Sequence, residues 1–277
     1  MTNGQGGISA QRIMDDSAMT MRQVLAVAIM VGLNALDGFD VLAISFASPG
    51  IAREWQIDRT ALGFVLSMEL IGMAVGSILL GRLADRIGRR PTILGCLVVM
   101  AIGMIAATRA TSVVDLSVWR VLTGLGIGGM LAAINAAAAE FSNARHRSIC
   151  MALMVVGYPI GSVIGGTISS VLLRGGDWRV VFEVGAIATI AFLPLVWWLV
   201  PETPAYIDSK RRGDTLARLN ASLAALGHAP RTALASPAAG AGAGGEAGAG
   251  PGFPMLFSPA YRATTLLITA AYFFHII

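Results

Sequence analysis

Two aspartates spaced three residues apart are the first candidates for chemistry in this sequence. Asp37 and Asp40 lie within an apolar run, and their spacing places both carboxylates on roughly one face of a helix, with Asn34 three residues earlier. Carboxylates within apolar segments are energetically expensive and mark ion pathways or ion pairs. We therefore expect at least one of them to bind a proton or pair with a cation beside an aqueous cavity. The alternative is that one of them only caps or hydrogen-bonds near a helix end.

Three further charged residues lie in apolar runs: Glu69, Arg120 and Glu183. Arg120 recurs with Gly124 and Gly128 at every fourth residue, so the three share one stripe of a helix. We expect Arg120 to face a carboxylate or backbone carbonyls inside a bundle, because an unpaired guanidinium is costly there. Glu69 is interpreted as a second protonatable site, a snorkelling side chain or a helix-paired carboxylate, and Glu183 as an interfacial residue.

The composition favours a membrane protein. Of 277 residues, 55% are apolar and 13% are charged, against about 25% charged in an ordinary soluble domain. With a mean hydropathy of +0.71 and 33 glycines, the chain suits lipid-facing helices that meet through small side chains. No catalytic motif is recognisable, so we expect no enzymatic activity. The histidines and cysteines lack ligand or disulfide spacing, so we expect neither a metal nor a cofactor.

Seven apolar runs approach the roughly 20 residues that a membrane-spanning helix needs. They are Val24–Ala47, Ala61–Leu80, Ile93–Thr108, Val113–Ala139, Ile149–Leu173, Val180–Val200 and Ala263–Ile277. The expected organisation is a tail over residues 1–22, a six-helix bundle over 23–200, a linker over 201–261 and the start of a seventh helix over 262–277. Within the linker we expect a basic amphipathic helix over Tyr206–Gly227, followed by a flexible Ala/Gly-rich tract over Ala235–Gly252.

The basic residues segregate by loop. If the N-terminal tail lies inside, fourteen of the 20 Lys and Arg residues lie on inside segments and five on outside loops, and Arg120 lies within a span. This bias predicts a multi-pass membrane protein with a cytoplasmic N-terminus. We expect the membrane to be a bacterial inner membrane. The bias also argues that the lipid bilayer, and not nucleic acid, is the partner of this basic chain, whose pI is about 9.6.

The segment that joins the second and third runs reads Gly-Arg-Leu-Ala-Asp-Arg-Ile-Gly-Arg-Arg over residues 81–90. It resembles the loop signature of the major facilitator superfamily, G-x-L-x-D-R-x-G-R-[RK], at every defining position. The resemblance implies a conformational latch formed by Gly81, Asp85, Arg86, Gly88, Arg89 and Arg90. Asp85 can accept hydrogen bonds from the arginines, and Gly81 is expected to let helix ends approach closely. The alternative is a loop that only anchors the chain at the membrane surface.

Two more segments carry the same resemblance. The stretch from Arg120 to Gly128 is similar to the fourth-span signature R-x-x-x-G-x-G-x-G of that superfamily, whose arginine is implicated in proton coupling. Glu140 and Arg147 resemble the E-x(6)-R element found after this span in several branches. We interpret them as an ion-pair clamp on the inside.

Residues 37–40, Asp-Gly-Phe-Asp, resemble the D-G-[FY]-D motif in the first span of the aromatic acid:proton symporters. The similarity extends along all six spans. Residues 201–204, Pro-Glu-Thr-Pro, resemble the P-E-S-P element that closes the sixth span in that family and also in sugar porters. The resemblance implies an all-α membrane protein, the six-helix N-terminal half of a major facilitator fold with a partial seventh transmembrane helix.

The implied function is proton-coupled uptake of a small aromatic carboxylate, similar to benzoate or hydroxybenzoate, by a secondary active transporter. Asp37, Asp40 and Arg120 are then the expected proton-coupling or substrate-binding residues. The alternatives are a symporter of protons with a sugar or another metabolite, and a fragment that is inactive without a missing C-terminal half. In such a fragment we expect these three cavity-facing residues to lack their opposite wall and to face lipid or a second copy.

Overall fold

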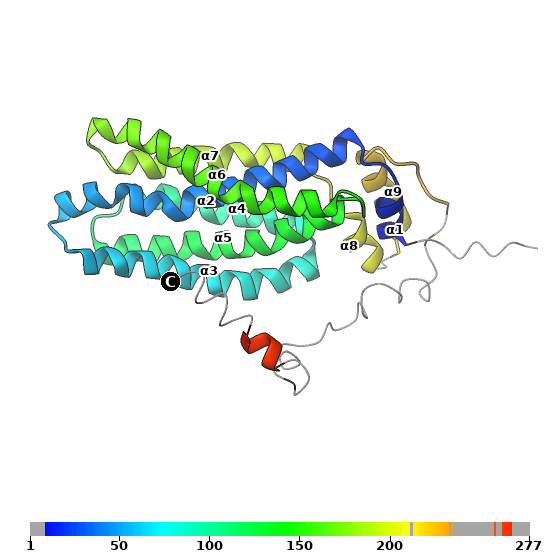
Figure 1. Cartoon of the computed structure of the whole chain (residues 1–277), viewed down its shortest axis with the longest axis horizontal. Coiled ribbons are helices and arrows are strands. Elements are labelled where there is room, and N and C mark those ends of the chain that lie inside the picture. Colours follow the sequence, from blue (N-terminus) through cyan, green and yellow to red (C-terminus); the bar gives the residue numbers. More distant parts are fainter. Residues whose placement is uncertain (1–8, 211–212, 233, 235–257, 259–261, 268–277) are drawn as a thin grey trace, which may run out of the picture. The chain divides into compact units, whose positions relative to one another are not determined.

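The computed structural model describes residues 9–210, 213–232, 234, 258 and 262–267 (Figure 1). These residues belong to two units, one of Ala10–Ala233 and one of Met1–Ser9 with Leu234–Ile277, and the helices named below lie in the first. In the second unit, residues 262–267 are helical, at the start of the expected seventh run. The rest of that run and the Ala/Gly-rich tract lie outside the described residues.

Six long helices correspond to the first six expected spans. They are α2 Met21–Trp55, α3 Arg59–Ile87, α4 Arg89–Ala107, α5 Val113–Phe141, α6 Arg147–Leu172 and α7 Arg179–Leu199. All six are long and apolar enough to cross a membrane. The first unit also contains four shorter elements: α1 Ala10–Asp16, the 3-10 turn η1 Leu173–Gly175, α8 Pro204–Ser209 and α9 Thr215–Ala225. The all-α, multi-pass membrane architecture predicted from the sequence is confirmed.

Helix α2 continues past its expected end at Ala47 and through a proline to Trp55. Pro49 has no N–H to donate to the carbonyl of Ser45, which would normally accept it in a helix. The Ser48 hydroxyl donates to that carbonyl instead, at 2.8 Å. Because the carbonyl keeps a partner, the helix tolerates the proline, and the expected boundary was too early.

Glycines set how closely the long helices pack. α3 lies along α5, α2 lies along α6, and α4 lies against both α5 and α7 (Figure 1). A Cβ at Gly76 of α3 would fall on the Leu125 carbonyl of α5, and a Cβ at Gly161 of α6 would fall on the Ala35 carbonyl of α2. Only glycine allows the paired backbones to approach this closely. The predicted glycine-mediated packing is therefore present in both helix pairs.

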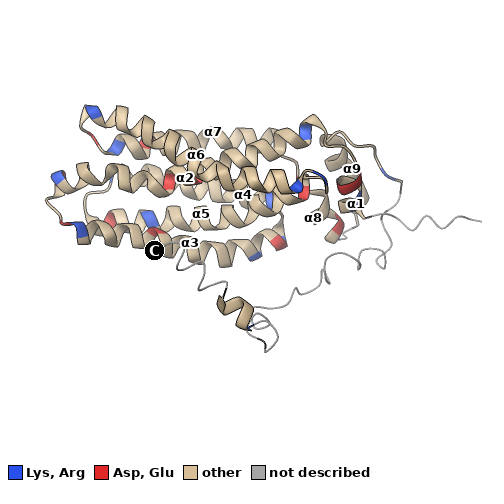
Figure 2. Ribbon diagram, viewed as in Figure 1, with Lys and Arg blue, Asp and Glu red and all other residues tan. Residues whose placement is uncertain are grey.

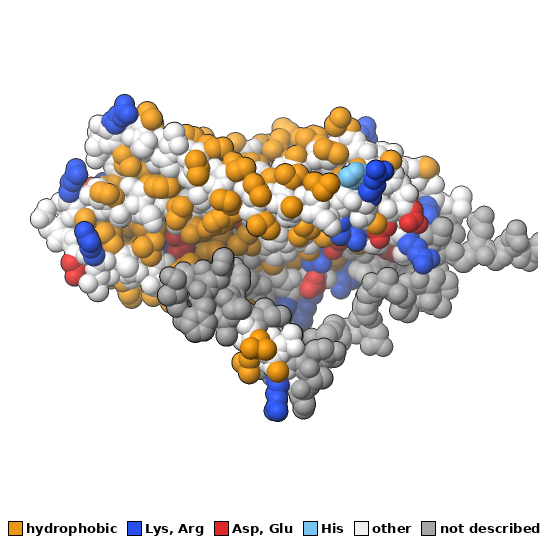
Figure 3. Space-filling view, in the orientation of Figure 1, with side chains coloured by type: hydrophobic (Ala, Val, Ile, Leu, Met, Phe, Trp, Pro, Cys, Tyr) orange, Lys and Arg blue, Asp and Glu red, His pale blue; other side chains and the backbone are white. Residues whose placement is uncertain are grey.

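Apolar side chains cover the outside of the bundle as well as its core (Figure 3). The exposed large hydrophobic side chains are concentrated on α3, α6 and α7, and include Val155 at 73% and Trp198 at 78% exposure. Soluble domains rarely expose so much contiguous apolar surface, whereas lipid solvates it. Charged side chains lie mainly toward the two ends of the long helices (Figure 2).

One end of the bundle carries the junction of α3 and α4 together with α1, α8 and α9 (Figure 1). We call it the signature-loop end, because residues 81–90 lie there. The Tyr206 hydroxyl of α8 donates to the Arg86 carbonyl at 2.7 Å, and the Ser222 hydroxyl of α9 donates to the Glu202 carbonyl at 2.6 Å. These bonds attach both short helices to the end of the bundle.

The structure corrects the expected single helix over Tyr206–Gly227. It contains two helices, α8 and α9, with a break between them. Gly213 and Asp214 lie in this break, directly before α9. Glycine loses the most conformational freedom in a helix, and aspartate competes with helical hydrogen bonding, so both residues favour an interruption.

Candidate functional site

Four charged side chains are buried in the described part of the chain. Asp37 and Asp40 come from α2, Glu69 from α3 and Arg120 from α5, and none is more than 1% exposed. We call these four residues the buried charge cluster. The cluster contains one guanidinium group and three carboxyl groups. The carboxyl group that pairs with the guanidinium is therefore the one that has a counter-ion.

Arg120 uses its whole guanidinium group. Its Nε donates to Glu69 Oε2 at 3.1 Å, and Nη2 forms an ion pair with the other oxygen of the same carboxylate. Nη2 also donates to the Asp40 backbone carbonyl at 2.8 Å, and Nη1 lies 3.6 Å from the Met104 sulfur. The Phe182 ring of α7 lies 5.5 Å from the guanidinium carbon. Arg120 therefore faces both a carboxylate and a backbone carbonyl, the two kinds of partner expected from the sequence.

The two aspartate carboxyl groups stand apart from this pair. Within the described residues, neither the Asp37 nor the Asp40 carboxyl oxygens have a hydrogen-bond partner. Asp40 Oδ1 faces Gly185 of α7, where an added Cβ would lie 3.1 Å away. No group of three or more His, Cys, Asp or Glu side chains in this part of the chain is arranged to hold a metal ion. The aspartates are thus available for a proton and not committed to a structural bond.

The structure corrects the expectation that Asp37, Asp40 and Arg120 face an open cavity and lack an opposite wall. All three are 0% exposed within this single bundle. Met104 of α4 and Phe182 of α7 lie against the Arg120 guanidinium, and α2 packs against α3, α5, α6 and α7. Two surface hollows of about 480 and 350 Å³ are lined by other residues.

The expected latch residues lie at the junction of α3 and α4. Gly88 adopts φ +117°, a left-handed conformation that favours glycine, and an added Cβ there would collide with the Glu202 carboxylate. Glu202 Oε1 accepts the backbone N–H of Arg89 at 2.9 Å and that of Arg90 at 3.4 Å. The carboxylate thereby caps the first turn of α4, as anions do at helix N-termini. Burial raises the pKa of the Glu202 carboxyl above its usual value of 4.5.

The arginines of this junction bind different elements. Arg89 bridges Asp85, at 2.6 Å, and Glu140 of α5, at 3.2 Å. The Arg90 guanidinium donates to the Trp197 carbonyl of α7 and lies 5.2 Å from the centre of its ring. The junction therefore connects α3 and α4 to both α5 and α7.

Two latch residues have smaller roles in this arrangement. Arg86 contributes its backbone carbonyl to Tyr206. A Cβ at Gly81 would lie 3.4 Å from the Ala132 Cβ, which is an ordinary van der Waals contact. α3 and α5 therefore lie near each other at Gly81, but their backbones do not approach as closely there as at Gly76.

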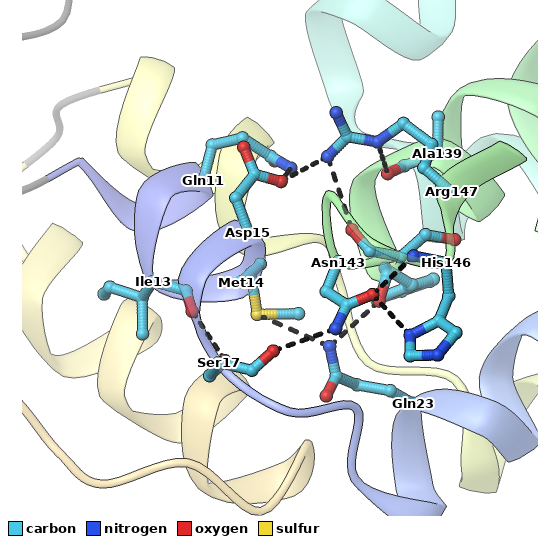
Figure 4. Close-up of polar contacts among 12 residues, drawn as sticks. Gln11, Ile13, Met14, Asp15, Ser17, Gln23, Ala139, Asn143, His146 and Arg147 are labelled. Atoms are coloured by element: carbon cyan, nitrogen blue, oxygen red, sulfur yellow. Dashed lines mark hydrogen bonds and ion pairs between the residues drawn. The ribbon is translucent and has the colours of Figure 1, made fainter.

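The expected clamp between Glu140 and Arg147 is also corrected. Glu140 pairs with Arg89, as described above, whereas Arg147 forms an ion pair with Asp15 of α1 (Figure 4). Arg147 also donates to the carbonyls of Ala139, at 3.2 Å, and Ser142, at 3.3 Å. The two residues end one helix and begin the next, and the turn between them directs Glu140 toward α4 and Arg147 toward α1.

Three contributors were not chosen as site residues from the sequence. Glu69 was considered, and its helix-paired interpretation is the one that the structure supports. Glu202 could have been found from the Pro-Glu-Thr-Pro element, since an acidic residue at a helix boundary is a natural cap. Asp15 lies in the polar N-terminal segment, which had no apolar periodicity to indicate that α1 would pack on the bundle.

Six apolar helices around a buried charge cluster define a multi-pass helical membrane protein. The chain belongs to the Major Facilitator Superfamily, whose sequence model matches residues 30–277. It is similar to a solved structure of the proton:xylose symporter XylE, with a TM-score of 0.68 and 20% identity over 76% of this chain and 51% of that one. A partially occluded, inward-open structure of XylE from E. coli gives a TM-score of 0.64 at 21% identity, covering 73% of this chain and 56% of that one. At such identities these structures establish the fold alone.

Curated relatives cover nearly the whole chain. The gallate transporter of Pseudomonas putida is 29% identical over 94% of this chain and 56% of its own length. The 4-hydroxybenzoate transporter PcaK of Acinetobacter baylyi is 30% identical over 97% of this chain and 58% of its own. The chain thus spans somewhat more than half the length of the curated relatives it matches.

Proposed function

We propose that this chain forms part of a secondary active transporter that takes up a small aromatic carboxylate together with protons. The observation that carries the proposal is the pair of fully buried aspartates, Asp37 and Asp40, whose carboxyl groups have no partner among the described residues. The substrate class is supported by relatives that are named for gallate and 4-hydroxybenzoate.

Asp37 and Asp40 are the proposed proton-binding groups, and Arg120 is the cation that organises their surroundings. A buried carboxylate without a counter-ion is unstable, whereas the protonated acid is tolerated. Proton binding and release at these groups therefore changes the energy of the enclosed conformation by a large amount. Such a change is what couples a proton to an alternating-access transition.

The junction of α3 and α4 is the proposed conformational latch. The Arg89–Asp85 pair is exposed on its aspartate side, at 66%, whereas the Arg89 and Glu140 side chains are only 17% and 19% exposed. An exposed pair such as Arg89–Asp85 contributes about 0–1 kcal/mol. It can therefore break and re-form during transport, while the glycine turn at Gly88 and its Glu202 cap hold the loop in shape.

The signature-loop end is proposed to face the cytoplasm, in a bacterial inner membrane, with the N-terminus on the same side. The excess of basic residues on the segments at this end supports the orientation. Transport is proposed to need a second six-helix half, since alternating access in this fold moves one half against the other. The length of the curated relatives supports this requirement.

The test uses a chimera that joins the chain to the C-terminal half of PcaK from Acinetobacter baylyi, reconstituted into proteoliposomes. With an inward proton gradient, we expect accumulation of labelled gallate, 4-hydroxybenzoate or benzoate, and loss of accumulation when the gradient is collapsed. The 277-residue chain alone should show no uptake above empty vesicles. Accumulation of xylose without any aromatic acid would favour the sugar alternative, and gradient-independent uptake would contradict proton coupling.

A further inference from the structure

Glu69 has no assigned part in the proposed proton coupling, yet it binds Arg120, the one buried cation among the described residues. Of the four buried charged residues, Glu69 alone contacts Arg120 through its carboxylate, and it occupies both Nε and Nη2 of the guanidinium. A bidentate, charge-assisted contact of this type is among the strongest that arginine makes. The Glu69–Arg120 pair is therefore electrically complete by itself.

Arg120 nevertheless lies close to the α2 aspartates. Its Nη2 donates to the backbone carbonyl of Asp40, at 2.8 Å, and not to that residue's carboxyl group. The guanidinium is thus held beside α2 but forms no hydrogen bond with the carboxyl group of Asp37 or Asp40. Without a competing anion, the nearest carboxylate for this cation would be that of Asp40.

We propose that Glu69 is a positioning residue, which binds Arg120 and so keeps this cation from pairing with Asp40, leaving the α2 carboxyl groups free to take up and release protons. The inference rests on the proposed proton-coupled transport and adds the residue that keeps the aspartates uncommitted. It explains why a third carboxylate lies in a site that holds a single arginine. It also explains why both aspartates are without partners although a guanidinium lies beside them.

The other elements around the cluster offer few competing groups. The two arginines of α4, Arg89 and Arg90, bind groups at the signature-loop end, and its Cys96 thiol interacts electrostatically with Asp37. α7 contributes Phe182 and Gly185 to this region, and its one acidic residue, Glu183, is exposed. α6 meets α2 at Gly38 through the Tyr158 backbone. Glu69 is therefore the carboxylate that determines the state of Arg120.

Infrared spectroscopy of the 277-residue chain in lipid nanodiscs tests the proposal, because protonated carboxyl groups give a resolved carbonyl band. The single variants Asp37→Asn and Asp40→Asn assign the two aspartate contributions. In Glu69→Gln we expect the Asp40 contribution to vanish at neutral pH and to return only about 1–3 pH units lower than in the wild type, as for a carboxylate beside a cation. Glu69→Asp, which keeps the charge, should retain the band.

Two further variants complete the test. Glu54→Gln removes a carboxylate from the more exposed Glu–Arg pair with Arg179 and should leave the Asp40 band unchanged. The double variant Glu69→Gln/Arg120→Gln removes the cation as well, so the Asp40 band should return to its wild-type pH dependence. The double variant also tests the proposal if the single variant Glu69→Gln does not fold.

Two results would overturn the inference: an unchanged Asp40 band in Glu69→Gln, or an Asp40 that remains ionised in the double variant. The measurement reads protonation without transport. Its failure is therefore distinguishable from failure of the proposed function, which would appear as absent uptake in the proteoliposome assay while the infrared bands behave as expected.

Discussion

Among the described residues, the Glu–Arg pairs Arg120–Glu69 and Arg179–Glu54 each use both carboxylate oxygens but lie in different environments, which allows the value of burial to be measured. Arg179 of α7 binds Glu54 of α2 through two contacts of 2.8 Å, and these side chains are 27% and 42% exposed. The side chains of Arg120 and Glu69 are 0% and 1% exposed. Both pairs join different helices through bidentate contacts and differ in their access to solvent. Each also has a further polar partner: Trp178 donates to Glu54, and Arg120 donates to the Asp40 carbonyl.

Replacing each arginine by glutamine should have very different costs. Arg120→Gln leaves Glu69 as a buried charge without a counter-ion, which costs about 3–5 kcal/mol of unfolding free energy. Arg179→Gln breaks a solvent-exposed pair and should cost about 1 kcal/mol or less. The double variant Glu69→Gln/Arg120→Gln removes both buried charges, so we expect it to recover most of the loss.

The unfolding free energy can be measured on the purified chain in mixed micelles, by circular dichroism against an increasing fraction of denaturing detergent. Arg179→Gln serves as the matched control for Arg120→Gln. Equal losses in these two variants would refute the argument that burial sets the cost. A double variant as unstable as Arg120→Gln would show that the guanidinium acts through its other contacts and not as the counter-ion of Glu69.

Three other predictions concern the aspartates, the loop and its cap. Asp37→Asn and Asp40→Asn preserve the shape of the side chain but remove its titration. Gradient-driven accumulation by the chimera should therefore collapse while the protein remains in the membrane. Wild-type uptake with unchanged pH dependence in both variants would exclude the two aspartates as proton sites. Asp85→Asn removes the exposed contact with Arg89. We expect it to lower the uptake rate of the chimera more than its equilibrium binding of substrate. Equal losses of both would indicate that the loop only anchors the chain at the membrane surface. Burial raises the pKa of Glu202 above 4.5, so the folded state favours its protonated form and loses stability relative to Glu202→Gln as the pH rises above this value. Thermal unfolding of the two proteins across this window checks the sign, and parallel curves would contradict it.

Much of the architecture could be predicted from the sequence because the bilayer restricts what a chain can do. A span must be a helix of about 20 apolar residues that satisfies its own backbone, so composition and run length located the six long helices. The four-residue spacing of Gly124 and Gly128 identified one face that packs closely, since this spacing is a property of one helix alone. The loop of residues 81–90 and the position of Asp37, Asp40 and Arg120 within apolar runs were likewise visible as local patterns.

The partners of the charged side chains were decided only by the tertiary structure. Glu140 and Arg147 are close in sequence, yet they bind Arg89 and Asp15. Which residue pairs with Arg120 depends on the rotation and axial position of α3 and α5, and these follow from glycine contacts between segments that are distant in the chain. The same packing encloses the aspartates within one bundle, where spacing along α2 indicated only that they share a face. The periodicity of a helix determines on which of its faces a side chain lies. The partner of that side chain is determined by the neighbouring helix that packs against this face.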